Sequence, residues 1–169
     1  FLGRIPKNLE DSRFTAIELD SISGRILKQL YQKEQVYIQG YEKTELQDNF
    51  YDVAISNVPF GNYGVSDRRY NRENFKIHDY FFAKSLDKVK NGGIIAFVTS
   101  KGTLDKITPN VREYIAKRAK LLGAIRLPTN AFRVVANTDV TTDIIFLQKS
   151  DKELENRPSW VDVAKIFDD

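Results

Sequence analysis

The chain has 169 residues, 41% of them hydrophobic, and a formal net charge of +3. This length suits one domain with a sizeable hydrophobic core, and the mild basic surplus slightly favours nucleic acid as a partner. The lack of cysteine excludes disulfides, thiolate metal sites and cysteine nucleophiles, and a single histidine argues against a histidine-rich metal site or a serine–histidine triad. No apolar run reaches the length of a membrane span, so we expect a cytoplasmic protein that needs neither membrane nor metal.

Short apolar runs and one amphipathic segment alternate in the first third of the chain. Residues 14–19 form an apolar run that predicts a buried strand, and Asp20 follows as the N-cap of a helix at residues 21–31. The apolar side chains of this helix recur on one face, at Ile22, Ile26, Leu27 and Leu30. Two further short strands are expected at residues 36–38 and 51–56.

The rest of the chain continues this alternation. An arginine-rich polar segment at residues 66–75 predicts a surface loop. Asp79 is expected to cap a helix that runs to about Val89, and Asn91-Gly92-Gly93 to end it before a central strand at 94–99. The inward-facing residues of that helix are Phe81, Phe82, Leu86 and Val89. The remaining elements expected are a helix at 111–121, strands at 123–126 and 143–148, and a short helix near 160–167.

Strands that alternate with helices predict an α/β fold with a mostly parallel sheet, covered by helices on both faces. Residues 127–142, between the last two strands, show no helical pattern, which suits an antiparallel pair at the sheet edge. We therefore expect one core domain over residues 1–150, followed by a charged tail at 151–169.

Three polar features follow predicted strands, and ligands of open α/β sheets bind beyond the carboxyl ends of the strands. Glu18 ends the first strand, and as a carboxylate there it either accepts hydrogen bonds from both hydroxyls of a ribose or is a solvated loop acid. Residues 57–60 follow the third strand, and Thr99-Ser100-Lys101 follows the central one. Their convergence predicts a site at this edge.

The sequence Asn57-Val58-Pro59-Phe60 resembles the hallmark of the amino-methyltransferases, Asn/Asp/Ser-Pro-Pro-Tyr/Phe after the fourth strand. The resemblance implies methyl transfer from S-adenosyl-L-methionine to the N6 amine of an adenine flipped out of DNA. Asn57 would accept from the amine with its side-chain oxygen and Val58 with its backbone carbonyl, while Phe60 stacks on the base. Val58 replaces the usual first proline, so one restricted φ angle is lost and Pro59 keeps the other.

The resemblance extends over residues 1–149. Ile17-Glu18-Leu19-Asp20 is similar to the family's second motif, whose acid binds the cofactor ribose, and Phe1-Leu2-Gly3 resembles the segment after the glycine-rich cofactor loop. Segments such as IHDYFFAKSLD and TDIIFLQK resemble methylase domains of helicase–methylase proteins on phages and conjugative elements. This likeness implies a Rossmann-like methyltransferase sheet. Its cofactor contacts would be Gly3, Glu18, Leu19, Asn57, Phe81 and, in place of the usual third-motif acid, Tyr41 or Glu42.

The resemblance also implies partners. Arg68, Arg69 and Arg72 follow the motif and are either contacts to DNA phosphates or part of a polar loop. The family's first strand and its target-recognition domain have no counterpart in this chain, so we expect both in a longer parent protein, together with helicase segments. The unpaired strand edges that result favour sheet closure or a homo-oligomer. His78 is expected to be structural, because the chemistry needs no base.

Other functions stay open at this point. The lack of cysteine excludes methylation at cytosine C5. Methylation of the cytosine N4 amine stays open, as do RNA guanine and protein glutamine as acceptors, because the methyltransferases that act on them share this type of motif. A catalytically degenerate domain that binds DNA or serves as a scaffold is the non-enzymatic alternative. The sequence does not decide between self-protection and regulation.

The absent first strand gives a first testable expectation. The isolated chain should bind S-adenosylmethionine weakly or not at all and should be inactive alone, because that strand lies in the middle of the family's sheet. Isothermal titration calorimetry measures this directly. A micromolar dissociation constant would contradict the expectation.

Overall fold

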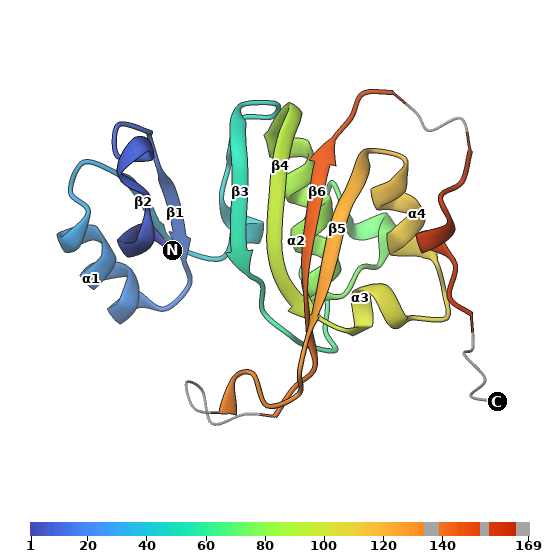
Figure 1. Ribbon diagram of the computed structural model, residues 1–169. Coiled ribbons are helices and arrows are strands. Elements are labelled where there is room, and N and C mark those ends of the chain that lie inside the picture. Colours follow the sequence, from blue (N-terminus) through green and yellow to red (C-terminus); the bar gives the residue numbers. More distant parts are fainter. Residues whose placement is uncertain (134–138, 153–155, 165–169) are drawn as a thin grey trace. The chain divides into compact units, whose positions relative to one another are not determined.

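The computed structural model describes residues 1–133, 139–152 and 156–164, and the chain forms two compact units, Phe1–Leu46 and Gln47–Asp169 (Figure 1). The first unit contains two parallel strands, β1 (Thr15–Glu18) and β2 (Gln35–Ile38), joined by helix α1 (Ser21–Leu30). Its short 3-10 helices are η1 (Leu2–Arg4), η2 (Lys7–Leu9) and η3 (Tyr41–Lys43).

Helix α1 begins as its sequence predicts. The Asp20 carboxylate accepts a hydrogen bond from the Ser23 N–H at 2.6 Å, which satisfies one of the open donors of the first turn. Gly24 is buried, and a Cβ there would lie 2.8 Å from the Ile38 side chain, so glycine allows α1 to approach β2 closely. The predicted apolar face of α1 is not buried. Leu27 is only half-buried, and three of its residues are more than half exposed: Ile22, Ile26 and Leu30.

The second unit is built on a four-stranded sheet with the order β3-β4-β6-β5. β3 is parallel to β4, whereas β6 is antiparallel to both β4 and β5. The strands are β3 (Tyr51–Asn57), β4 (Val89–Ser100), β5 (Ala119–Leu127) and β6 (Thr142–Lys149). The helices are α2 (Ile77–Lys88), α3 (Gly102–Asp105) and α4 (Asn110–Ala116), with 3-10 turns η4 (Asn71–Glu73) and η5 (Ser159–Val161).

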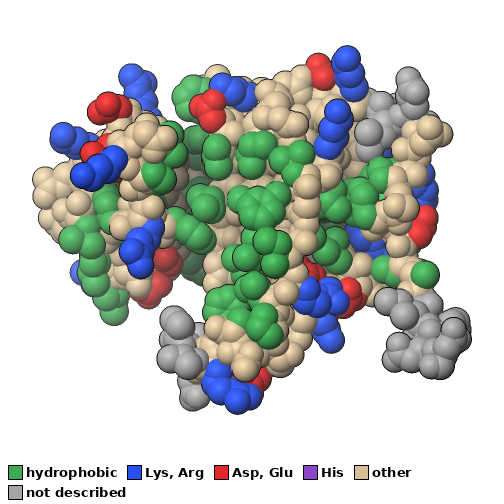
Figure 2. All heavy atoms as spheres, viewed as in Figure 1, with side chains coloured by type: hydrophobic (Ala, Val, Ile, Leu, Met, Phe, Trp, Pro, Cys, Tyr) green, Lys and Arg blue, Asp and Glu red, His purple; other side chains and the backbone are tan. Residues whose placement is uncertain are grey.

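The hydrophobic core of this unit lies between the sheet and helices α2 and α4, which cover the same face (Figure 1). Its centre includes Phe82 and Leu86 of α2, Phe97 of β4 and Leu147 of β6, each at most 2% exposed. The opposite face is also apolar, and Figure 2 shows hydrophobic side chains spread across it. Its residues that are more than half exposed include Val53 and Ile55 of β3.

Three expectations about the sheet need correction. The strands form two sheets in separate units, and the larger one is mixed rather than mostly parallel. The last two strands do form the expected antiparallel pair at the sheet edge, but the strand that runs against the others is β6, which lies between β4 and the edge strand β5. Among the described elements, helices α2 and α4 cover one face of the larger sheet, since the β3–β4 and β4–β5 connections that contain them pass on the same side. The α/β class itself is confirmed.

The observed ends of some elements differ from the predicted ones where strand pairing competes with a helical sequence pattern. The helix expected at 111–121 ends at Ala116, and β5 begins at Ala119. Residues 119–121 fit a helix by their spacing, but they pair with Leu147, Gln148 and Lys149 of β6 and thereby satisfy their backbone groups. Asp79 is not a helix cap, because Lys76 occupies the N-cap position of α2 and Asp79 is buried in the first turn.

The C-terminal segment packs on α4. Arg112 of α4 is fully buried, and its Nε donates to the Val161 carbonyl of η5 at 2.6 Å. Val161 itself is fully buried, so this part of the charged tail contributes to the second unit. The short helix expected near 160–167 is limited to the single turn η5, residues 162–164 are not helical, and 165–167 lie outside the described residues. Within the described ranges, no helix is long and apolar enough to cross a membrane.

Two glycines in strands provide a matched test of backbone packing. A Cβ at Gly93 would lie 2.8 Å from the Lys90 carbonyl oxygen and 3.0 Å from that of Asp52, whereas a Cβ at Gly123 would meet nothing within 4 Å. Gly93→Ala should therefore lower the free energy of unfolding by ~1–3 kcal/mol, and Gly123→Ala should change it by less than ~0.5 kcal/mol. Urea denaturation of both variants measures the difference, and equal midpoints would refute the close approach at Gly93.

Candidate functional site

Asn57 is the last residue of β3 and lies at its carboxyl end, opposite Val98 of β4. The ladder continues one step further, because the Val58 N–H donates to the Val98 carbonyl at 3.0 Å. The Asn57 residue is exposed, so its amide is accessible to a ligand at the end of the strand. The structure thus puts the predicted asparagine at the edge where ligands of α/β sheets bind.

Val58 anchors the segment that follows β3. Its side chain is 2% exposed and belongs to the core cluster with Phe82 and Phe97. On either side of it, Asn57 and Pro59 are exposed, and Phe60 is 37% exposed. A buried side chain and a backbone hydrogen bond therefore restrain residue 58, where the family usually has the fixed φ angle of proline. Phe60 is not part of the core.

Beyond the motif, the chain is tied to helix α2. The ring of Tyr63 covers Gly61, where a Cβ would lie 2.3 Å from the ring. The Tyr63 carbonyl accepts from the N–H of Ile77, the first residue of α2, at 2.8 Å. Tyr63 is 56% exposed, so a second accessible aromatic ring follows Phe60 within three residues. Tyr63 is not among the site residues predicted from the sequence, although Gly-Asn-Tyr-Gly after the motif is typical of a tight turn.

The arginines that follow the motif are not equivalent. Arg69 forms ion pairs with Asp48 at 2.6 Å and with Asp87 at 3.0 Å, so its guanidinium already has two carboxylate partners. Arg68 and Arg72 are exposed and form no ion pair with the described part of the chain. The loop is also held to helix α2, because Tyr70 is buried and its hydroxyl donates to Asp87 at 2.6 Å. Burial raises the pKa of this tyrosine.

A cluster of buried polar side chains lies at the carboxyl end of β4. Asp79 of α2 is 2% exposed and accepts hydrogen bonds from the Thr103 hydroxyl at 3.3 Å and from Lys106. The Thr103 hydroxyl also lies 3.2 Å from that of Thr99, the strand residue four positions earlier. Sequence reasoning missed this cluster, although the Thr99–Thr103 spacing of four residues and the His78-Asp79 pair were available signals.

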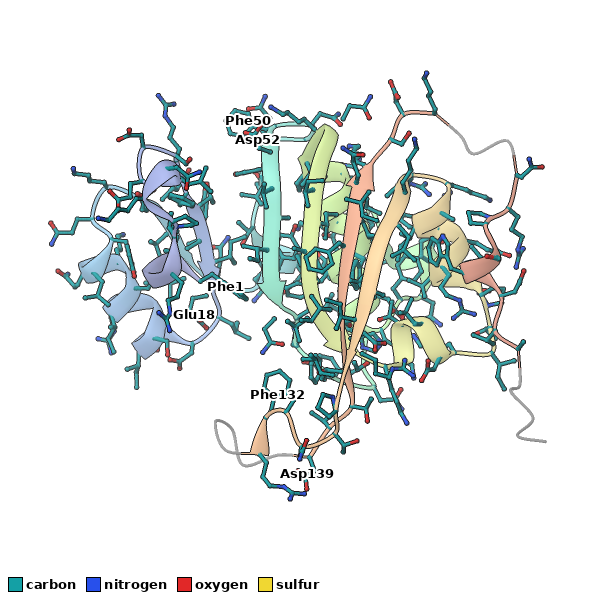
Figure 3. The ribbon with its side chains drawn as sticks, viewed as in Figure 1. Phe1, Glu18, Phe50, Asp52, Phe132 and Asp139 are labelled. Atoms are coloured by element: carbon teal, nitrogen blue, oxygen red, sulfur yellow. The ribbon has the colours of Figure 1, made fainter. Side chains whose placement is uncertain are left out.

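A second set of charges holds the end of the β5–β6 hairpin. Arg126 of β5 binds Asp143, its register partner on β6, through two hydrogen bonds of 2.9 and 3.0 Å. The same guanidinium contacts Asp105 of α3 at 2.7 Å. Asp143 therefore forms a cross-strand ion pair through a carboxylate that is 1% exposed. Asp139, on the hairpin loop labelled in Figure 3, pairs with Arg133.

In the first unit, two predicted cofactor contacts are adjacent at the end of β1. Glu18 is half-buried, and one of its carboxylate oxygens accepts from the Asp20 N–H at 2.9 Å (Figure 3). Its neighbour Leu19, directly after this half-buried strand, is 75% exposed. A carboxylate held by the backbone beside an accessible aliphatic surface suits a ribose and the base attached to it.

The third-motif candidates follow β2, which ends beside β1 because the two strands are parallel. The Glu42 carboxylate lies over buried Gly40, where a Cβ would be 2.2 Å from Oε1. Glycine is therefore required for this position of the carboxylate. Tyr41 is half-buried in the same 3-10 turn.

Two further predicted cofactor contacts, Gly3 and Phe81, lie far from Glu18 and Glu42 in the sequence. Gly3 helps to line a cavity of about 330 Å³ with Tyr31 and Glu34 in the first unit. Phe81 is half-buried on α2 in the second unit and packs against its core cluster. The predicted contacts thus divide between the units, with Gly3, Glu18, Leu19, Tyr41 and Glu42 in the first.

Comparison with known proteins identifies the family. A model of the N-6 DNA methylase family matches residues 17–168, nearly the whole chain. The chain belongs to the N-6 DNA methylase family. The match includes the segment Asn57–Phe60 and continues through the docked C-terminal segment. Family membership confirms the resemblance that the motif and its strand context carry.

Individual relatives agree with this membership. Over 149 residues, 85% of its length, the chain is 30% identical to the defense against restriction protein B of Escherichia phage P1, of which it spans 6%. A Listeria monocytogenes protein assigned to the class I S-adenosylmethionine-dependent methyltransferases is similar in structure, with a TM-score of 0.61 and 22% identity over 86% of this chain and 46% of the other. A Vibrio vulnificus protein assigned as the modification subunit of a type I restriction enzyme is also similar in structure. Its TM-score is 0.63, with 23% identity over 79% of this chain and 32% of the other. At such identities the two structures establish the fold alone.

The burial of Val58 leads to a stability prediction with a control on the strand that precedes it. Val58→Ala removes two methyl groups from the core, whereas Val53→Ala removes them from a side chain that is 53% exposed. The first substitution should cost ~1–3 kcal/mol of unfolding free energy and the second a fraction of that. Chemical denaturation checks both variants. Similar losses would show that Val58 does not anchor the segment.

Proposed function

We propose that this N-6 DNA methylase chain, as part of a longer protein, transfers a methyl group from S-adenosyl-L-methionine to the N6 amine of an adenine flipped out of DNA. The observation that carries the proposal is the exposed Asn57 at the carboxyl end of β3, followed by a core-anchored Val58 and an accessible Phe60. This combination presents one amide oxygen, one restrained backbone carbonyl and one aromatic ring within four residues.

The proposed chemistry follows from the acceptor. The lone pair of an adenine amine is delocalised into the ring, which makes the nitrogen a weak nucleophile. Two hydrogen-bond acceptors on its two hydrogens, the Asn57 side-chain oxygen and the Val58 carbonyl, favour a pyramidal nitrogen with a localised lone pair. Phe60 would stack on the extruded base, a contact worth roughly 1–3 kcal/mol. Correct alignment then supplies most of the acceleration, so no general base is required.

The cofactor assignment rests on residues of the first unit. S-adenosylmethionine supplies an electrophilic methyl group on its sulfonium. We assign the ribose hydroxyls to the Glu18 carboxylate, because its backbone hydrogen bond fixes its orientation at the end of β1. Leu19 would pack on the adenine of the cofactor, with Tyr41 or Glu42 as its further contact. The exposed leucine and the glycine-dependent position of Glu42 both suit this use.

The arginines support DNA as the acceptor. Arg68 and Arg72 have exposed side chains without ion pairs to the described residues, so both are available to phosphates of the target strand. Arg69 is a weaker candidate, because binding a phosphate would compete with Asp48 and Asp87. The missing partner segments that we infer, for target recognition and for the first strand, belong to a longer protein. The chain spans only a small part of its phage relative, in line with that inference.

Substitutions in the motif test the proposal. In the longest natural polypeptide that contains this chain, Asn57→Ala should lower kcat by ~10²–10³-fold through loss of one acceptor. Phe60→Ala should lower kcat/KM by ~5–150-fold through loss of stacking. Phe50→Ala is the control, since Phe50 is an accessible aromatic residue, 54% exposed against 37% for Phe60, just before the opposite end of β3.

The assay offers DNA, RNA and protein acceptors together with a radiolabelled methyl donor. Label in DNA at adenine N6 supports the proposal, and label at cytosine N4, in RNA or in protein alone would reassign the substrate. Cofactor binding without any transfer would instead favour the scaffold alternative.

A further inference from the structure

The first turn of α2 connects the segments that leave β3 and β4. On the β3 side, the Ile77 N–H donates to the Tyr63 carbonyl at 2.8 Å. On the β4 side, the Asp79 carboxylate accepts from Thr103 and Lys106, and Thr103 in turn contacts Thr99 of the strand. This turn therefore joins the two segments at the edge where Asn57 lies.

His78 lies between these two connections and is 5% exposed. Its Nε2 is 3.5 Å from Oδ1 of Asp79 and would be 3.8 Å from a Cβ on Gly102 of α3. The Gly61 carbonyl, one residue beyond Phe60, is near enough to raise the pKa of the imidazole, although neither ring nitrogen reaches hydrogen-bond geometry with a described residue. The imidazole thus fills the space between the motif segment and α3.

The charges around His78 favour its neutral form. Burial is the main cause that lowers its pKa below the ordinary value of 6.5, and Lys106 and Lys76 add to this effect. The Asp79 carboxylate and the Gly61 carbonyl oppose it without reversing it. The unfolded chain therefore takes up a proton near the ordinary pKa and the folded chain only at lower pH. The free energy of unfolding should fall as the pH decreases from 6.5 toward the folded pKa, and should not depend on this group above 6.5.

We propose that His78 and Asp79 are positioning residues that hold the Asn57–Gly61 segment against the Thr99–Lys106 segment. Both side chains are buried, so neither touches the substrate, and each acts through backbone and side-chain contacts to the two segments. The proposal rests on the proposed function, because the geometry to be held is that of the Asn57 amide and the Val58 carbonyl. Protonation of His78 would add a buried cation beside Lys106 and loosen this arrangement.

The first test needs no enzymatic activity. His78 is the single histidine of the chain, so the imidazole signals in a nuclear magnetic resonance titration of the 169-residue chain belong to it without assignment. The ring should titrate below pH 6.5, Lys106→Met should raise its pKa, and Asp79→Asn should lower it further. Titration at or above 6.5, or no response to either substitution, would overturn the proposal.

The second test uses the longest natural polypeptide that contains the chain. At pH 8, Asp79→Asn should lower kcat by ~10–100-fold with little change in KM for the methyl donor, because it disturbs alignment rather than binding. His78→Gln, which is neutral at every pH, should keep most of kcat at pH 8 and lose the decline of the parent enzyme below pH 6.5. Lys90→Met, at the opposite end of β4, is the control and should retain the parent profile.

The outcomes are distinguishable. A parent enzyme that transfers no methyl group to DNA would defeat the proposed function, while the titration still reports on His78. An active parent enzyme whose Asp79→Asn variant keeps full kcat, or whose His78→Gln variant keeps the acid decline, would overturn the positioning role alone.

Discussion

The candidate site depends on one packing constraint, the burial of Val58 directly beyond the end of β3. A side chain in the core and an N–H bound to the Val98 carbonyl leave residue 58 little freedom, so its exposed neighbours keep a defined direction. Families with proline at this position restrict the backbone through the ring, whereas this chain restricts it through packing. Within these four residues, Val58 contributes to the stability of the core, while residues 57, 59 and 60 stay accessible to a ligand.

Polar side chains extend this constraint across the edge of the sheet, and four of them are buried: Asp79, Thr99, Thr103 and Asp143. The cluster of Asp79, Thr99, Thr103 and Lys106 joins the first turn of α2 to the segment after β4, and Arg126 with Asp143 and Asp105 joins the hairpin to α3. Polar contacts of this kind are costly to bury unless they are satisfied, so they specify one arrangement more strictly than apolar packing does. They lie at the carboxyl ends of β3 and β4, where we propose that the acceptor amine is held.

The N-6 DNA methylase fold is represented here by two units, each with strand edges that lack a partner among the described residues. The apolar residues left exposed, on α1 in one unit and on the outer sheet face in the other, are those that a two-sided α/β sheet would bury. This explains why hydrophobic periodicity predicted helix α1 correctly and the burial of its apolar face incorrectly. Periodicity shows which face of a helix or strand is apolar, but not whether another element covers it.

The sequence by itself determined the alternation of strands and helix, the Asp20 cap, the exposed position of Asn57 at a strand end and the family, because all of these depend on local pattern and on a short motif. Only the tertiary structure decided that Val58 is a core residue, that Arg69 is bound to Asp48 and Asp87, and that Asp79 is buried rather than a cap. It also placed β6 between β4 and β5 and ended α4 at Ala116. The physical reason is that these outcomes depend on partners distant in the sequence, whose backbone and charge requirements no local pattern contains.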